Sequence, residues 1–305
     1  MKLQTLATRI TPLLARLRCP QCGAPLALFE NRSLVCEQRH CFDLSTKGYI
    51  NLAPSHNQSA EKYDAALFES RSRVFADGFY AHVAQALQTV LERHMATTSH
   101  NPGAGEPPAP SVRLAGSSSA PSPADQAIPL HESSLPQSFA PLVVDVGCGE
   151  GYYARVLAES ATHPAVVGVD LSRDAIHAAA RQTPTLQWFV ADLTRLPFAD
   201  HSADVLLDVL TPADYREFAR VLKPDGLLLK VIPADDYLCE FRQAVAEQLH
   251  SSEFSNARVQ EHLRANAQVV EQFSVRRTVP VTPAQAQAFL RMTPMTFGLT
   301  DAQRE

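Results

Sequence analysis

The stretch at 141–153, PLVVDVGCGEGYY, constrains the fold of this chain more than any other feature. An apolar run that carries Asp145 near its end leads through a glycine-rich turn into a helix-like segment. A second apolar run, at 166–169, ends in Asp170, nineteen residues after Gly151. Glycines let a backbone turn sharply and approach a ligand, and an acid at the tip of the next strand can hold ribose hydroxyls. The pattern therefore predicts a nucleotide-type site at the carboxyl edge of a parallel sheet.

The residues of this turn favour S-adenosylmethionine over a dinucleotide. The turn has the pattern D-x-G-x-G-x-G and not G-x-G-x-x-G. Asp145 and Glu150 would repel a pyrophosphate, whereas the sulfonium and amino group of S-adenosylmethionine tolerate nearby acids. We expect Gly147, Gly149 and Gly151 to approach the methionine part of the cofactor, with Asp145 near its amino group. The alternative is a structural strand-to-helix turn without a ligand.

Beyond this turn, apolar runs alternate with helical stretches. We expect strands at 186–190, 204–209 and 227–232, with a helix exit and turn at 222–226 before the last of them. Such alternation predicts an α/β fold with a doubly wound sheet and a site at the carboxyl ends of its strands.

Residues at the tips of the other strands complete the predicted cofactor site. Asp170 is expected to bind the ribose, while Asp192 and Leu193 frame the adenine. Tyr152 and Tyr153 adjoin the glycine turn, and adjacent residues of a helix face different ways. One of them is therefore expected to line the pocket and the other to lie in the core.

The carboxyl end predicts a sixth strand at 273–281 and a helix at 283–290. A complete sheet of this kind has one more strand after that helix. None is visible in the last residues of the sequence, so we expect either a shortened sheet or a different strand order.

A second motif lies near the other end of the chain. Cys19, Cys22, Cys36 and His40 follow the spacing C-x2-C-x13-C-x3-H, which supplies three thiolates and an imidazole for a structural zinc ion. Cys41 is the rival fourth ligand. Short runs between the ligand pairs predict a small hairpin, which has too little core to fold without metal. Unrelated reduced cysteines are the alternative, and no secretory signal favours disulfides.

Together these segments resemble the bacterial 23S ribosomal RNA guanine-N1 methyltransferases. The resemblance rests on CPQCGAPL, CEQRHCFDLSTKGYINL, SRVFADGFYAHV, DVGCGEGYY, RLPF, LTPADYREFARVLKPDG and FLRMTP. It implies a class I, Rossmann-like methyltransferase sheet behind an N-terminal zinc-binding module that takes part in RNA recognition. It further implies methyl transfer from S-adenosylmethionine to N1 of a guanine in a hairpin loop, and it favours His40 over Cys41 as zinc ligand. Apart from the resemblance, we also consider a homodimer as the assembly.

The resemblance also adds site residues. The tyrosine that matches Tyr80 contacts the cofactor in this family, although a tyrosine capping a helix against the core is an alternative. Tyr237 stands where the family presents a histidine that contacts the cofactor, so this contact rests on a departure from the family pattern.

For the acceptor base, we expect the loop after the strand at 204–209. Asp208, or less favourably Asp214, could accept the N1 proton of guanine or bond its amino group. Pro212 belongs to the loop whose backbone carbonyls could equally well grip the base. The other interpretation is that Asp208 is a strand-end residue and Asp214 a helix cap.

The sequence divides into five parts. They are an N-terminal extension (1–18), the zinc-binding module (19–52), a helical connector (53–95), a disordered insert rich in Pro, Ala and Ser (96–140) and the methyltransferase domain (141–305). We expect the extension to be flexible rather than a targeting segment, although it could form a short basic amphipathic helix.

Charge is uneven along the chain. The net charge is −5 overall, whereas residues 1–52 hold seven Lys or Arg against three Asp or Glu, a net of +4. A basic face there would dock phosphates. No apolar run approaches the length of a membrane span, and we expect a cytoplasmic protein. The rival functions are a small-molecule methyltransferase, which would have no reason for the zinc motif, and a zinc-ribbon RNA-binding protein with an inactive methyltransferase domain.

Overall fold

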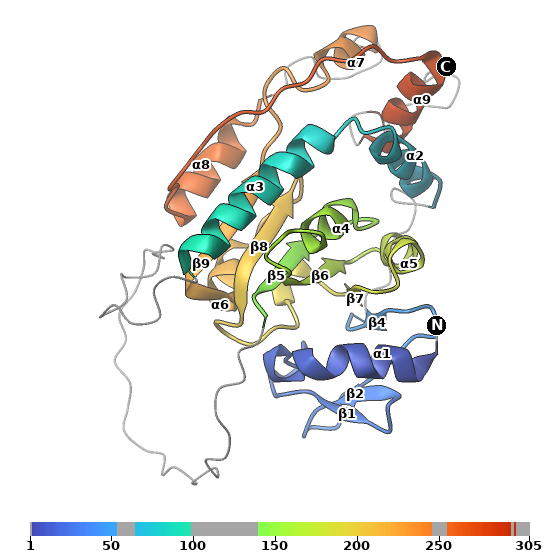
Figure 1. The fold of residues 1–305 in the computed structure, drawn as a ribbon, viewed down its shortest axis with the longest axis vertical. Helices are drawn as coiled ribbons and strands as arrows, with labels where there is room; N and C mark the ends of the chain where they lie inside the picture. Colours follow the sequence, from blue (N-terminus) through green and yellow to red (C-terminus); the bar gives the residue numbers. More distant parts are fainter. Residues whose placement is uncertain (1, 54–64, 99–139, 246–254, 294–295, 297–305) are drawn as a thin grey trace.

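The structure is a computed structural model that describes residues 2–53, 65–98, 140–245, 255–293 and 296. Apart from its two ends, the insert predicted at 96–140 lies outside the described residues. Figure 1 shows the fold, with a central sheet between two groups of smaller elements.

The central sheet has six strands in the order β4-β7-β6-β5-β8-β9, and every pair is parallel. The strands are β4 (Ile50–Asn51), β5 (Leu142–Val146), β6 (Ala165–Asp170), β7 (Gln187–Val190), β8 (Ala203–Val209) and β9 (Leu222–Val231). The strand order reverses between β5 and β8, which is where open α/β sheets bind their ligands. The predicted doubly wound parallel sheet is therefore confirmed.

Helices cover both faces of this sheet and extend beyond one end of it (Figure 1). They are α2 (Ala65–Ala76), α3 (Ala81–Thr98), α4 (Tyr152–Ala158), α5 (Arg173–Gln182), α6 (Tyr215–Val221), α7 (Cys239–Ala244), α8 (Ala257–Asn266) and α9 (Pro283–Met292). One core joins the sheet to α3, α4 and α5. A second core joins the other face to α6 and to the N-terminal elements. None of the described helices is long and apolar enough to cross a membrane.

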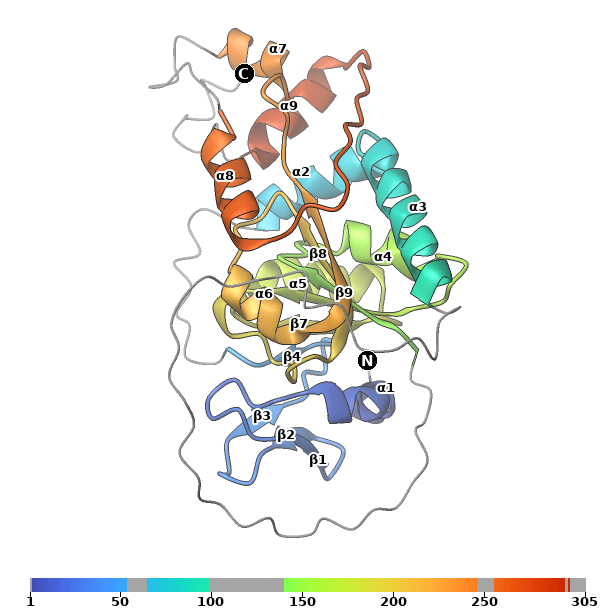
Figure 2. The ribbon, with the colours of Figure 1, turned by 90° about the vertical axis from the view of Figure 1, so that its left-hand side faces the viewer.

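The N-terminal module is a small antiparallel sheet beneath a helix. It consists of α1 (Leu3–Ile10), a 3-10 turn (Thr11–Arg16), β1 (Ala27–Phe29), β2 (Ser33–Val35) and β3 (Cys41–Asp43), with strand order β1-β2-β3. The hairpin predicted between the two ligand pairs is thus confirmed. In both views this module lies at one end of the long axis, and α7 and α9 lie at the other (Figures 1 and 2).

Residues 2–18 are packed, and the prediction of a flexible extension is wrong. Leu6 and Ile10 are fully buried, because they form one apolar face of α1 that joins the core beneath the large sheet. Arg9 donates to the carbonyl of Gly48 at 3.1 Å and to Oε1 of Gln187 at 3.3 Å. The side chain thereby ties α1 to the end of the zinc module and to β7.

Two other predictions fail at the carboxyl side. The helix-exit turn expected at 222–226 is instead the beginning of β9, which tolerates Pro224 because it is an edge strand of the described sheet. The segment at 273–281, predicted as a strand, forms no strand. Three of its apolar side chains, those of Phe273, Val275 and Val281, are exposed, because the segment lies against no strand of the described sheet. The helix predicted after it is confirmed as α9.

Candidate active site and metal centre

The glycine turn between β5 and α4 requires glycine for two reasons. Gly147, Gly149 and Gly151 have φ angles of +71°, +56° and +79°, a region that strains other residues. In addition, a Cβ atom on Gly147 would lie 2.3 Å from Oγ1 of Thr211, and one on Gly151 would lie 2.3 Å from the ring of Trp188. The turn therefore presents bare backbone at the point where the strand order reverses.

Three acids surround this turn, as the sequence predicts. Asp145 and Glu150 are each 1% exposed, and Asp170 ends the neighbouring strand β6. Burial, with a smaller contribution from the neighbouring acids Asp170 and Glu150, raises the pKa of Asp145 to about 8. Oδ2 of Asp145 accepts a hydrogen bond from the amide of Ala154 at 3.1 Å. At neutral pH the Asp145 carboxyl is therefore held largely in its protonated form.

Asp170 organises the backbone on both sides of the site. Its Oδ2 accepts from the amide of Gly149 at 2.9 Å, and its Oδ1 accepts from the amide of Ser172 at 2.8 Å. Burial raises the pKa of Asp170, whereas these two amide hydrogen bonds oppose the rise. The carboxylate thus links the glycine turn to the start of α5. It lies where the sequence predicts a ribose-binding acid.

Arg71 is a site residue that the sequence analysis missed. It extends from α2 to the glycine turn, where its Nε lies 3.6 Å from Oε2 of Glu150. Its guanidinium is so close to Gly149 that a Cβ there would be 3.5 Å from the central carbon and both terminal nitrogens. Nothing in the sequence distinguishes Arg71 from Arg73, which is exposed and pairs with Glu69 on the same helix.

Aromatic side chains from three segments meet next to Arg71. The hydroxyl groups of Tyr80 and Tyr237 are hydrogen-bonded to each other. Phe75 stacks on Tyr152 with ring centroids 4.3 Å apart and meets Tyr153 edge-on at 5.8 Å. Tyr153 is 6% exposed whereas Tyr152 is half-buried, so the two adjacent tyrosines differ in burial as expected.

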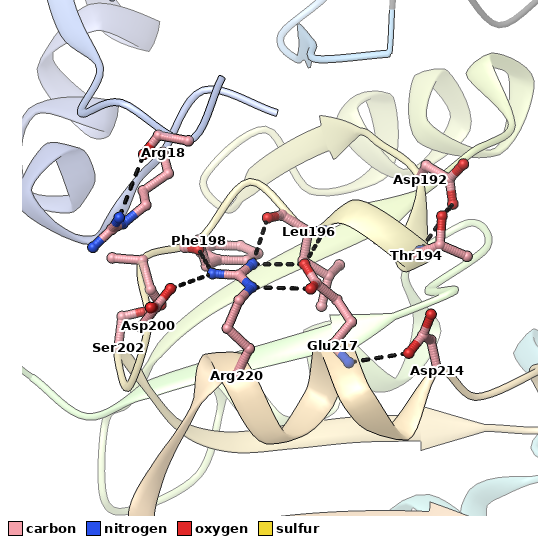
Figure 3. A network of polar contacts seen from close by, with 12 residues as sticks. Arg18, Asp192, Thr194, Leu196, Phe198, Asp200, Ser202, Asp214, Glu217 and Arg220 are labelled. Atoms are coloured by element: carbon pink, nitrogen blue, oxygen red, sulfur yellow. Dashed lines mark hydrogen bonds and ion pairs between the residues drawn. The ribbon is translucent and has the colours of Figure 1, made fainter. Parts of the chain in front are cut away.

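The predicted adenine side is held by a polar network, drawn in Figure 3. Asp192 caps a short 3-10 turn, Leu193–Arg195, by accepting from the amide of Thr194 at 2.9 Å. Arg220 on α6 donates to the carbonyls of Leu196 and Phe198 at 3.0 and 2.7 Å, and it pairs with Glu217 and Asp200. These contacts fix the loop after β7 against α6. Asp192 and Leu193 are both half-buried at its start.

On the other side of the turn lies the loop that follows β8. Asp208 at the end of β8 is fully buried, and its Oδ2 is 2.7 Å from Nζ of Lys230 on β9. Burial raises the pKa of Asp208 to about 6, although Lys230 opposes the rise. Leu210 has a φ of +57° and is 42% exposed, and Pro212 is also exposed. Asp214 caps α6 through the amide of Glu217, which confirms the cap interpretation for this residue.

The predicted metal ligands converge in the N-terminal module. The ligand atoms of Cys19, Cys22, Cys36 and His40 all lie within 4.8 Å of one another. Nδ1 of His40 is 3.5 Å from the Cys19 sulfur and 3.4 Å from the Cys36 sulfur, and the sulfurs of Cys22 and Cys36 are 3.7 Å apart. Tetrahedral ligands about 2.3 Å from zinc are about 3.7 Å apart. The donor set therefore fits a closed zinc site.

The rival ligand Cys41 lies outside this cluster. Its thiol is exposed and faces Oδ1 of Asp43 at 4.0 Å. Two tight turns place the other ligands: Gly23, with a φ of +77°, donates its amide to the carbonyl of Cys19, and Arg39, with a φ of +64°, donates to that of Cys36. The choice of His40 as the fourth ligand is confirmed.

Comparisons with known proteins agree with both halves of this arrangement. Residues 143–226 match the family model described as "Methyltransferase domain", and residues 17–61 match the one described as "RlmA, N-terminal".

Three relatives match most of the chain. The first, "Putative 23S rRNA (guanine-N(1)-)-methyltransferase YxjB" of Bacillus subtilis, is 31% identical over 92% of this chain and 86% of its own length. A protein of Micromonospora griseorubida with the same enzyme name is 30% identical over 96% of this chain and 90% of its own length. The "23S rRNA (guanine(748)-N(1))-methyltransferase" of Streptomyces fradiae is 30% identical over 86% of this chain and 79% of its own length. This S-adenosylmethionine- and zinc-binding chain belongs to the family of 23S rRNA (guanine-N1)-methyltransferases.

Proposed function

We propose that this protein transfers a methyl group from S-adenosylmethionine to N1 of a guanine in a hairpin loop of 23S ribosomal RNA. One observation carries the proposal: a single chain holds both the glycine turn with its acids and the four-ligand metal cluster, in the arrangement of its family. A small-molecule methyltransferase needs the first of these features and has no use for the second.

The cofactor supplies an electrophilic methyl group on a positively charged sulfur. In the proposed site, the glycine turn faces the methionine part, Asp170 binds the ribose, and Asp192 with Leu193 borders the adenine. Tyr80, Tyr152 and Tyr237 border the remaining side of the proposed cofactor site. The chain has to hold guanine N1 in line with the carbon–sulfur bond that breaks, so positioning supplies much of the rate.

The proton on guanine N1 has to leave as the new bond forms. We assign the acceptor site to the loop after β8, with Asp208 and Pro212. A pKa of about 6 suits Asp208 to accepting a proton near neutral pH. The burial of Asp208 and its ion pair with Lys230 favour the alternative that Asp208 positions this loop. If Asp208 takes the proton, Asp208→Asn lowers kcat and changes its pH profile; if it positions the loop, the variant raises KM for RNA.

The zinc module is proposed to contact the RNA. Arg32, Arg39 and Lys47 are exposed on its surface, where they can reach phosphates. The target base has to leave its stack to enter the site, which costs little for a loop nucleotide. A ribosomal RNA substrate also implies action in the cytoplasm. The assembly as a homodimer is tested by light scattering of the purified protein.

The function is tested with tritiated S-adenosylmethionine and unmodified 23S RNA, followed by nucleoside analysis. We expect labelled 1-methylguanosine. We expect Asp170→Asn to lower its formation about 10-fold or more, because the variant weakens the hydrogen bonds of this side chain to the glycine turn and to the ribose. Asp174→Asn, an exposed acid four residues away on α5, is the matched control and keeps full activity. Label transferred only to a small molecule would overturn the proposal.

A further inference from the structure

Arg71 lies at the proposed cofactor site with most of its hydrogen-bonding capacity unused. A guanidinium has five N–H donors. Among the described residues, its one ionic contact is Nε to Glu150, at 3.6 Å, which is too long for a good hydrogen bond. The group is held in place by aromatic rings, with its central carbon 5.7 Å from the Phe75 ring centre and 6.0 Å from that of Phe68.

Two buried acceptor or donor groups beside Arg71 are also unsatisfied. Both carboxylate oxygens of Glu150 are buried, and neither has a hydrogen-bond partner among the described residues. The hydroxyl of Tyr153 is likewise buried and has no hydrogen-bond partner among the described residues. Tyr153 and Arg71 pack against the same ring, that of Phe75. Buried polar groups are normally paired, so this group of side chains lacks a polar partner.

The chemistry of the missing partner follows from its surroundings. The guanidinium covers Gly149 in the turn that the methionine part of the cofactor approaches. That part carries one carboxylate and one amino group. A planar guanidinium matches a carboxylate with two parallel hydrogen bonds, and a hydroxyl can donate a third. Glu150 does not supply these hydrogen bonds, because its nearer oxygen lies 3.6 Å from Nε of Arg71 and neither of its oxygens accepts a hydrogen bond from the described residues.

We propose that Arg71, with the hydroxyl of Tyr153, binds the carboxylate of the methionine part of S-adenosylmethionine. The inference rests on the proposed function, because it requires this cofactor in this orientation. It makes α2 part of the cofactor site, although α2 precedes the glycine turn by more than seventy residues. Glu150 then serves to hold the guanidinium at the turn.

The test measures binding by calorimetry and needs no RNA. The ligands are S-adenosylhomocysteine and its decarboxylated form, 5′-deoxy-5′-(3-aminopropylthio)adenosine, which differs by the carboxylate alone. Wild-type protein should bind the decarboxylated ligand about 10- to 100-fold more weakly. The Arg71→Met variant should bind S-adenosylhomocysteine about 10- to 100-fold more weakly than wild type does, while its affinity for the decarboxylated ligand should not fall. Arg71→Lys, which keeps the charge without the planar fork, should recover part of the loss.

Arg73→Met is the matched control, since it makes the same change at an exposed position of α2, and it should bind both ligands as wild type does. The double variant Arg71→Met/Glu150→Gln avoids leaving a lone buried carboxylate and should reproduce the selective loss. Equal weakening of both ligands would make Arg71 a structural residue and overturn the inference, as would unchanged binding of S-adenosylhomocysteine. Wild-type protein that binds neither ligand would overturn the proposed function itself.

Discussion

Lys230 and Asp208 form a buried ion pair that joins two neighbouring strands beneath the proposed acceptor loop. Nζ of Lys230 lies 2.7 Å from Oδ2 of Asp208 and donates to the carbonyl of Thr211 at 3.0 Å. Their side chains are 6% and 0% exposed. The loop after β8 is thus fastened to β9 by one ammonium group. Because Thr211 also faces Gly147, the same contact sets the distance between the loop and the cofactor turn.

Removal of this ammonium group should be costly. Lys230→Met leaves the Asp208 carboxylate buried and unpaired, so the free energy of unfolding in urea should fall by about 3 kcal/mol. Lys230→Met/Asp208→Leu should recover most of the loss. Lys223→Met is the control: Lys223 pairs with Asp204 at 2.6 Å but is 36% exposed, and its loss should cost about 1 kcal/mol or less. Equal costs for the two single variants would show that the buried pair has no special role.

Gly151 should tolerate alanine less well than a glycine in open space. Gly78→Ala imposes a φ of +74° but meets no atom within 4 Å, so it should cost about 1 kcal/mol. Gly151→Ala adds a collision with Trp188 to a similar φ and should cost about 1 to 3 kcal/mol more, with weaker binding of S-adenosylhomocysteine. Urea unfolding and calorimetry measure the two effects. A Gly151→Ala variant as stable as Gly78→Ala would contradict the close packing of this turn.

The parts of the fold that were predictable are those encoded within a few residues. The glycine turn carries its own backbone requirement, and the Cys and His spacing carries its own ligand geometry. The failed predictions depend on distant partners. The strand expected at 273–281 is rich in Val but lies against no strand of the described sheet, and Pro224 suggested a turn although an edge strand accepts it.

The same reasoning explains which site residues were missed. Arg71 reaches the turn only because α2 packs above it, and no local pattern marks this arginine. Lys230 looks like an exposed strand residue until Asp208 is placed beside it. The N-terminal helix is a different case, because the apolar spacing of Leu6 and Ile10 already indicates one buried face.

The metal centre should depend on Cys22 and not on Cys41. Cys22→Ser removes one of four ligands, so the protein should lose zinc on dialysis against a chelator and become less stable by about 3 kcal/mol or more. Cys41→Ser should keep its zinc under the same dialysis, since its thiol faces Asp43. Elemental analysis and thermal unfolding check both variants. Zinc loss from Cys41→Ser together with retention by a His40→Ala variant would reverse the assignment.

Stability should fall as the pH rises towards 8, because of Asp145. The pKa of this carboxyl is about 8 in the folded chain and about 4 when unfolded, so the folded state binds the extra proton between these values. The stabilisation by the neutral form is complete below about pH 4 and is lost as the pH passes through about 8. Between about pH 6.5 and 8, Asp145→Asn should therefore lose less stability than wild type does. This window begins above the pKa of about 6 of Asp208, so the titration of Asp208 contributes little to it. Parallel pH curves for the two proteins in urea unfolding would contradict the raised pKa.

The most direct test of the central claim is primer extension along 23S RNA before and after treatment with the protein and S-adenosylmethionine. A methyl group on N1 blocks the pairing edge of guanine, so reverse transcription stops beside it. The account predicts a new stop at one guanine in a hairpin loop, dependent on the cofactor. Protein that binds S-adenosylhomocysteine and yet produces no stop on naked or ribosomal RNA would contradict it.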